Sequence, residues 1–309
     1  MNKVKFLLMT LVVALLASCG TSRTVPITGR KQNLLVSDEQ VLSLSNQEYT
    51  KYMQTAKKST DAANTEMVKR VGKRLATAVE AYLSQHGMAA ELKEYSWEFN
   101  LVQDKSVNAF CMPGGKIVVF EGLLPVTQDE ASLAVVLGHE IAHAVAKHSA
   151  ERISNAYKNQ YGTQLLGAVA AGAGVSADIQ QIGALVIGLG GKAFTSGFSR
   201  KQESEADHMG LIFAAMAGYD PQTATAFWQR MASVSGGGSS SIFSDHPSDA
   251  TRIKNIQGWM PEALTYYKPS TTTKTTTKTT KTTKTTKTTK TTKKTTKTTK
   301  KTTSTKKKK

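Results

Sequence analysis

The chain has 309 residues, 39% of them hydrophobic, which is enough for one large domain or two small ones. Its formal net charge of +17 is typical of a nucleic-acid-binding protein, but the excess lies at the two ends. Residues 271–309 contain 15 Lys, 23 Thr and one Ser, residues 1–18 contain two Lys, and neither stretch has an acidic residue. With these lysines set aside, 23 basic residues remain against 23 acidic ones, so we expect no specific nucleic-acid partner.

The first 18 residues have the pattern of a secretory signal peptide. Two lysines precede an apolar run that begins at Phe6 and is shorter than the ~20 residues that span a bilayer. The run ends in Leu16-Ala17-Ser18-Cys19, which resembles a bacterial lipobox and implies cleavage before Cys19 and lipidation of its sulfur. An ordinary signal peptide with a nearby cysteine is the alternative. Gly20 at the next position favours the outer membrane, with the chain facing the periplasm.

Composition divides the rest of the chain into three parts. Residues 19–36 mix Thr, Pro, Gly and Lys and are predicted to be a tether with little fixed structure. Residues 37–268 carry the periodic hydrophobic patterns of a folded domain. Residues 269–309 repeat Thr-Thr-Lys triplets, cannot build a core and are predicted to be disordered. This tail either contacts anionic surfaces or serves as a solubilising extension.

The folded domain combines helical and strand patterns. Ser37-Asp38-Glu39-Gln40 and Thr127-Gln128-Asp129-Glu130 are capping-box patterns that each predict the start of a helix. Only two cysteines are present, which excludes a disulfide-stapled fold, and Cys111 is expected to be buried as a small hydrophobic residue. The expected elements are, in chain order, helices over 37–58 and 64–86, strands over 97–101, 107–112 and 116–120, a helix over 128–149, a buried or mobile helical pair over 165–191, and helices over 200–217, from 220 onward and over 248–259.

The segment His139-Glu140-Ile141-Ala142-His143 carries the clearest chemistry. On a helix, residues four apart lie about 40° apart around the axis, so both imidazoles point to one side and can share one ion. Zinc suits two neutral imidazoles and a carboxylate with a fourth position for water, and Glu140 lies where it can accept a proton from that water. The alternative is a chance match on an exposed helix face. The apolar residues on both sides argue against it, because buried polar groups need a partner.

A second helix is expected to supply the third ligand as a carboxylate. Glu203 and Asp207 are four residues apart and share one helical face. Together with the motif at 139–143, the stretch 199–207 resembles the gluzincin metallopeptidases of family M48, which include HtpX-type heat-shock proteases and the CAAX prenyl protease. This resemblance implies that Glu203 binds zinc and that Asp207 orients a ligand imidazole.

Two side chains near these motifs are expected to take no part. Glu205 is about 200° from Glu203 around a helix and is predicted to face solvent. His148 lies about 140° around the helix from His143 and is predicted to point away from the metal.

Further matches extend the resemblance over about residues 37–265. Asn108 and the turn at Gly114-Gly115 resemble the family's substrate strand, where an extended peptide pairs by main-chain hydrogen bonds. A turn-forming Asn108 is the alternative. His246, in Asp245-His246-Pro247-Ser248, and Arg252 resemble a C-terminal motif of the soluble periplasmic members. The resemblance implies that His246 donates to the oxyanion or caps the zinc, unless it is a helix-start histidine, and that Arg252 stabilises the oxyanion or pairs with a carboxylate near the site.

The sequence thus predicts an α+β, mainly helical zincin-like metalloprotease domain with a small antiparallel sheet beside the HExxH helix and one zinc ion per chain. It predicts a zinc metalloendopeptidase, held at the membrane by a lipidated Cys19. The resemblance implies unfolded or misassembled envelope proteins as substrates, and the lack of long hydrophobic spans argues against prenylated ones. One alternative is a chaperone-like or binding lipoprotein with a structural or occluded zinc site, which would have no need of a base such as Glu140. Another is a surface adhesin that works through its tail.

Overall fold

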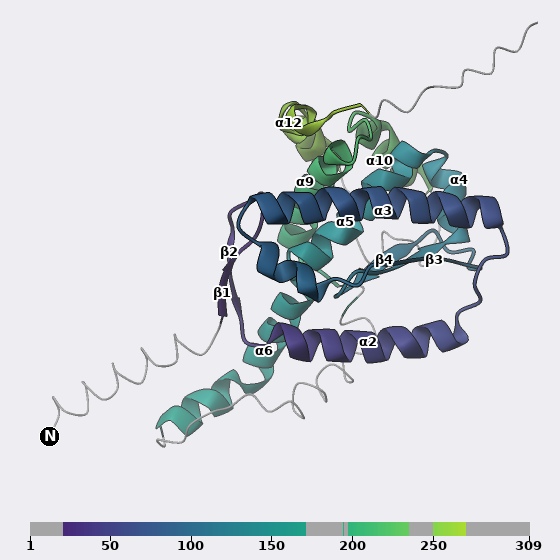
Figure 1. Ribbon diagram of the computed structural model, residues 1–309. Coiled ribbons are helices and arrows are strands. Elements are labelled where there is room, and N and C mark those ends of the chain that lie inside the picture. The colour runs from purple at the N-terminus through teal and green to yellow at the C-terminus, as the bar shows by residue number, and fades with distance from the viewer. Residues whose placement is uncertain (1–20, 171–193, 195–196, 235–249, 270–309) are drawn as a thin grey trace, which may run out of the picture. The chain divides into compact units, whose positions relative to one another are not determined.

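The computed structural model describes residues 21–170, 194, 197–234 and 250–269 (Figure 1). Helices α3 (Ala62–Gln85) and α5 (Glu130–Val145) cover one face of a small sheet, and helix α2 (Asp38–Thr55) covers the other. Helix α9 (Arg200–Met216) packs along α5. The α+β class and the mainly helical content expected from the sequence are confirmed.

Residues that the sequence predicts to be a tether form a hairpin. Strand β1 (Thr21–Thr24) pairs antiparallel with strand β2 (Lys31–Leu34), and the turn uses left-handed backbone at Ile27 and Gly29. The prediction of a tether is therefore wrong for this stretch. Its composition is that of a loop, but Val25 and Leu34 are only 1% and 4% exposed and hold the hairpin against the body of the domain.

The central sheet contains three strands in the order β3 (Glu98–Val102), β5 (Lys116–Phe120), β4 (Ala109–Met112). Strands β4 and β5 are antiparallel and joined by the expected turn, but β3 runs parallel to β5, so the sheet is mixed where antiparallel pairing was expected. The reason is the connection over 103–108, which carries the chain past the position of β5 and makes β4 an edge strand. Cys111 of β4 is buried, as expected.

The two faces of this sheet bury different hydrophobic clusters. Ile117 and Val119 pack with the apolar faces of α3 and α5. Val118, between them in the sequence, points to the other face and packs in a cluster with Val41 and Tyr49 of α2. This alternation is the strand periodicity that the sequence shows.

The first two long helices begin at side-chain caps. The capping box at Ser37 forms as predicted, with the Ser37 hydroxyl accepting from the backbone N–H of Gln40. Helix α3 begins a few residues earlier than predicted because Asp61 caps it and accepts from the backbone N–H of Asn64. A 3-10 helix, η1 (Ala89–Glu94), follows α3 and leads into β3.

The helix predicted over 128–149 is divided into two helices, of which the first, α5, begins at Glu130. The short elements η2 (Glu121–Leu123) and α4 (Leu124–Thr127) precede α5. Thr127 is therefore helical and does not form the predicted capping box. Asp129 caps α5 instead, accepting from the backbone N–H of Ser132 at 2.7 Å.

Helix α5 ends at a backbone reversal. Lys147 takes a left-handed conformation with φ 53°, and helix α6 (His148–Ala170) starts beyond it. Ion pairs with Asp38 of α2 at 2.7 Å and Glu94 of η1 at 2.8 Å hold the Lys147 side chain in place. Beyond Ala170, the helical pair expected over 165–191 lies outside the described residues.

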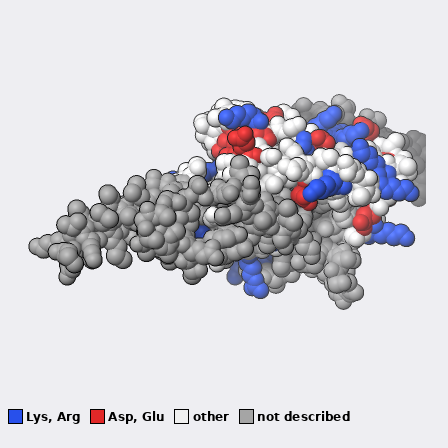
Figure 2. Space-filling model, turned by 90° about the horizontal axis from the view of Figure 1, so that it is seen from below, with Lys and Arg blue, Asp and Glu red and all other residues white. Residues whose placement is uncertain are grey.

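The C-terminal helices pack on α9 and α5. Helix α10 (Thr223–Val234) follows a turn at Asp220, and helix α12 (Ala250–Tyr266) closes the described part of the chain. Helix α12 extends past its predicted end near Trp259 and through Pro261, because Ala263 beyond it is fully buried in the core. Within the described ranges, no helix is both long and apolar enough to cross a membrane. On the face in Figure 2, basic and acidic side chains lie intermingled, in line with a neutral body.

Candidate metal centre

Helices α5 and α9 cross with their backbones in contact at two glycines. A Cβ added to Gly210 would lie 2.5 Å from the backbone nitrogen of His139, and one added to Gly138 would lie 2.6 Å from the carbonyl oxygen of Gly210. Glycine at both positions lets the helices approach more closely than any side chain would allow. The close approach brings Glu203, two turns before Gly210, opposite the histidines of α5.

Three donor atoms converge at this crossing. Nε2 of His139 lies 3.1 Å from Nε2 of His143. The Glu203 carboxylate lies 3.4 Å from Nε2 of His139 and 3.5 Å from Nε2 of His143. All three side chains are buried, at 6% exposure or less.

The spacing fits a tetrahedral ion of the size of zinc. Zinc binds nitrogen and oxygen ligands at about 2.0–2.1 Å, and the edge of a tetrahedron is about 1.63 times that length, or roughly 3.3 Å. The two histidine nitrogens lie 3.1 Å apart, and they lie 3.4 and 3.5 Å from different oxygens of the Glu203 carboxylate, on both sides of this value. Two imidazoles and a carboxylate are also the donor set of catalytic zinc sites that keep one position open. The residues therefore fit zinc.

The other ring nitrogen of His139 contacts Asp207, the residue to which the family resemblance gives the role of orienting a ligand imidazole. Oδ1 of Asp207 lies 2.9 Å from Nδ1 of His139. Burial lowers the pKa of His139, but hydrogen bonds to Asp207 and Glu203 outweigh it and raise the pKa to about 9. Because histidine binds a metal in its unprotonated form, a metal ion must displace the proton from Nε2.

Arg252 completes this side of the site. Its Nη2 donates to Oδ1 of Asp207 at 2.6 Å, and its guanidinium lies 3.5 Å from the centre of the Trp228 ring. Of the two roles expected for Arg252, the structure places it in the pairing with a carboxylate. The same Nη2 lies 3.2 Å from Nδ1 of His139, so Arg252 contacts both Asp207 and a metal-binding candidate.

The other ring nitrogen of His143 contacts His148, which the sequence predicts to point away. Nδ1 of His148 lies 2.9 Å from Nδ1 of His143, and the His148 side chain is fully buried. The prediction fails because it assumes that one continuous helix carries both histidines. The backbone instead reverses at Lys147, so that His148 contacts the ring nitrogen of His143 that faces away from Glu203. The ring of Phe198 stacks on His143, 4.1 Å between centroids.

Glu205, which the sequence predicts to face solvent, is buried against His148. Its Oε2 lies 3.0 Å from Nε2 of His148 and 2.8 Å from Nε of Arg30, which donates to it. Burial alone raises the pKa of Glu205, but hydrogen bonds from His148, Arg30 and Thr28 lower it to about 2. Glu205 is thus an internal carboxylate with its own cation, supplied by the N-terminal hairpin.

Glu140 follows His139 on α5 and is 2% exposed. Burial and then the negative charge of Glu140 raise the pKa of the Cys111 thiol in β4. Glu140 is thus a buried carboxylate next to a metal-binding candidate, on a helix that packs against β4.

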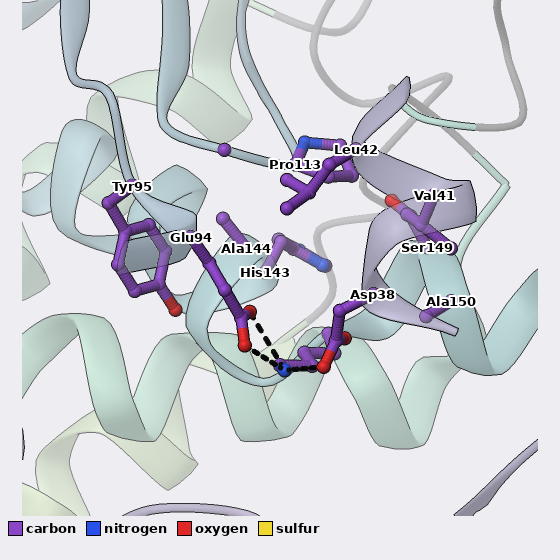
Figure 3. A pocket seen from close by; sticks show the side chains of 12 residues that line it. Asp38, Val41, Leu42, Glu94, Tyr95, Pro113, His143, Ala144, Ser149 and Ala150 are labelled. Carbon is purple, nitrogen blue, oxygen red and sulfur yellow. Dashed lines mark hydrogen bonds and ion pairs between the residues drawn. The ribbon is translucent and has the colours of Figure 1, made fainter. Parts of the chain in front are cut away.

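A cavity adjoins His143 on the side of the β4–β5 turn (Figure 3). His143 lies there between Glu94 and Val41, and Gly114 forms part of the lining. Gly115 has a different environment, because a Cβ at this position would lie 2.4 Å from the ring of Trp97.

Asn108 stands just before β4, with its side-chain oxygen accepting from the backbone N–H of Ala109 at 2.8 Å. The structure thus brings His139, His143, Glu203, Asp207 and Arg252 together, and places Asn108 and the two glycines at the ends of the edge strand. His246 and Cys19 lie outside the described residues, so their expected roles stay predictions.

Comparison with known proteins agrees with this geometry. The sequence profile of peptidase family M48 matches residues 62–260, which include every metal-binding candidate. The chain belongs to peptidase family M48. Family M48 is the gluzincin group that the sequence motifs indicate, so that resemblance is confirmed.

Named M48 relatives come from several organisms. The chain is 39% identical over 175 residues to the mitochondrial metalloendopeptidase OMA1 of Schizosaccharomyces pombe, which covers 56% of this chain and 49% of the relative. It is 31% identical over 229 residues to the metalloprotease LoiP of Escherichia coli, covering 73% of this chain and 82% of the relative. A putative beta-barrel assembly-enhancing protease of Vibrio cholerae is 32% identical over 141 residues, 43% of this chain and 28% of the relative. The chain spans about half or less of the length of the OMA1 relatives that it matches.

Proposed function

We propose that the protein is a zinc-dependent metalloendopeptidase that hydrolyses peptide bonds. The observation that carries this proposal is the convergence of His139, His143 and Glu203 at zinc-like spacing, with Glu140 as the neighbouring base. A structural zinc site has four protein ligands and no need of a base, whereas three ligands beside a carboxylate are typical of hydrolytic sites. Membership of a peptidase family supports the same conclusion.

The chain's own residues divide the work of hydrolysis. A bound zinc ion would supply Lewis acidity and lower the pKa of a water molecule to about 7. Glu140 accepts the proton of the attacking water and returns it to the leaving amine. The substrate lies extended along β4, whose outer edge has no partner strand among the described residues. Asn108 contacts the bound peptide, and His246 donates to the oxyanion.

Unfolded or misassembled envelope proteins are the proposed substrates, and the lipidated Cys19 is the proposed anchor in the outer membrane, facing the periplasm. The leader-like residues 1–18 support an export route. The Vibrio cholerae relative's name links that protein to beta-barrel assembly, which suits a role in the cell envelope.

The test is cleavage of an unfolded protein such as casein by the zinc-loaded chain. We expect cleavage that a chelator abolishes and added zinc restores, and that falls at least a hundredfold in Glu140→Gln. Glu66→Gln makes the same chemical change at an exposed surface ion pair and should cut at the wild-type rate. If the wild-type protein binds zinc stoichiometrically but cuts no unfolded substrate, the peptidase proposal fails and the alternative of a binding protein gains.

A further inference from the structure

In each histidine ligand, the ring nitrogen that faces away from the metal position contacts another side chain. The series of contacts that begins at His143 continues through His148 and Glu205 to Arg30 in the N-terminal hairpin. We propose that Arg30 and Thr28 of the hairpin position the metal ligand His143 by fixing Glu205 and His148. This inference rests on the proposed metal centre and names residues that act on it without touching the reacting atoms.

The hydrogen-bond donors and acceptors from His143 to Arg30 match in only one arrangement of the imidazole protons. Nε2 of His143 faces the other ligands, so its Nδ1 carries the proton and donates to Nδ1 of His148. His148 must then be protonated on Nε2, which donates to the carboxylate of Glu205. Both nitrogens of His148 are thus committed, and the ring can turn only if one of these contacts breaks. The His143 ring is fixed in turn, which keeps its Nε2 aimed at the metal position.

Glu205 needs the hairpin to keep its place. Its two oxygens accept from the Thr28 hydroxyl at 2.5 Å and from Nε of Arg30 at 2.8 Å. Nη1 and Nη2 of Arg30 donate to Glu151 of α6 at 2.6 and 2.9 Å, so one guanidinium bridges two helices. A buried carboxylate that lost this cation would have to move or take up a proton, and either change would release His148.

Independent contacts fix the hairpin itself next to α5. Arg23 pairs with Glu91 at 2.6 Å and donates to the carbonyl oxygen of Val145 at 2.9 Å. Gln32 donates to the carbonyl oxygen of Ala146 at 2.6 Å. These two carbonyls belong to the last turn of α5 and would otherwise lack a helical partner. The hairpin therefore holds both the end of the ligand-bearing helix and the groups behind His143.

The test measures zinc retention, separately from cleavage. Zinc-loaded protein is mixed with excess chromophoric chelator, and the rate of zinc transfer is followed by absorbance. Removing groups behind zinc ligands lowers metal affinity about 10- to 100-fold. If this loss lies in dissociation, Arg30→Gln and His148→Gln should each release zinc roughly ten- to a hundredfold faster than wild type. Arg30→Lys, which keeps a cation beside Glu205 without the fork, should recover part of the loss.

A double variant distinguishes positioning from general loosening. If Arg30 and His148 act along one chain, the Arg30→Gln/His148→Gln protein should release zinc no faster than the quicker single variant. Additive effects would overturn the proposal. Arg70→Gln breaks an exposed ion pair with Glu130 and should release zinc at the wild-type rate.

Two further outcomes keep the result interpretable. If circular dichroism shows that Arg30→Gln does not fold, Thr28→Val replaces it, because this change removes a single hydrogen bond to Glu205. Combined with His148→Gln, it should again release zinc no faster than the quicker single variant. Folded single variants that hold zinc as long as wild type would refute the positioning role while leaving the peptidase proposal intact. A wild-type chain that binds no zinc would instead refute the proposed function.

Discussion

The crossing of α5 and α9 at Gly138 and Gly210 leads to a sharp prediction for Gly210→Ala. The added Cβ would lie 2.5 Å from the backbone nitrogen of His139 and 2.8 Å from its Cα. Ordinary contacts begin at 3.4 Å, so the two helices must separate by about 0.9 Å. Neighbouring atoms are backbone and cannot rotate away.

This shift acts on the metal site directly, because its ligands lie on both helices. The Glu203 carboxylate now lies 3.4 and 3.5 Å from the two histidine nitrogens. Moving α9 outward by the same amount opens these separations to more than 4 Å, beyond the roughly 3.3 Å edge of a zinc tetrahedron. We therefore expect zinc affinity to fall at least tenfold.

Stability should fall as well. Overpacking a core costs about 1–3 kcal/mol, while replacing Gly by Ala inside a helix returns up to about 1 kcal/mol. Because the overlap is with backbone atoms, the cost lies in the upper part of this range, about 2–3 kcal/mol. The net loss is then about 1–2 kcal/mol, or about 2–8 °C in Tm for a domain of this size. Gly258→Ala is the matched control, since nothing lies within 4 Å of a Cβ added at that helical position and the variant should be as stable as wild type or more so.

The assay is thermal unfolding of the metal-free and zinc-loaded proteins, together with zinc affinity by chelator competition. The expected result is a lower Tm for the metal-free Gly210→Ala protein and a smaller rise in Tm on adding zinc. If Gly210→Ala unfolds at the wild-type temperature and binds zinc with wild-type affinity, the backbone contact does not set the spacing of the ligands.

Three other predictions test separate parts of the molecule. Asp207→Asn should lower zinc affinity about 10- to 100-fold, because the charged partner of His139 is lost; unchanged affinity in chelator competition would show that Asp207 does not orient the ring. Burial raises the pKa of Glu151, but hydrogen bonds from Arg30 and Gln202 lower it overall, so the folded-state pKa lies below the unfolded one. The stability from Glu151 is therefore present above its unfolded pKa near 4.5 and is lost as the pH falls through the lower folded value. In Glu151→Gln, the free energy of unfolding measured by urea titration should fall less steeply below this pH, and an equally steep fall would contradict the assignment. Deleting residues 269–309 should weaken salt-sensitive binding to heparin or lipopolysaccharide, and unchanged binding would rule out contact with anionic surfaces through the tail.

The parts of the site that the sequence predicts are those that depend on local geometry. His139 and His143 share a face because helical spacing is fixed, and Glu203 and Asp207 share one for the same reason. The pairing of these two helices came from the family resemblance, since spacing alone does not place one helix against another.

The parts that were missed depend on contacts between distant segments. His148 reaches His143 only because the backbone reverses at Lys147, and Lys147 carries no residue-type signal for a left-handed conformation. Glu205 is buried because Arg30 comes from a hairpin that composition alone describes as a loop. For the crossing of α5 and α9, in contrast, the sequence offers a signal in Gly210, because an isolated glycine inside a helical pattern lowers helix stability and points to a packing role.

The Arg30 contacts also have a consequence for the order of assembly. They join Arg30 to residues 121 and 175 positions later in the chain, and such distant contacts form late because a long loop must close first. The HExxH helix is made, and can fold locally, before α9 exists to supply Glu203 and Glu205. A growing chain therefore carries two of the three metal-binding candidates before the third exists, and the centre is complete only once the first and last thirds of the domain have met.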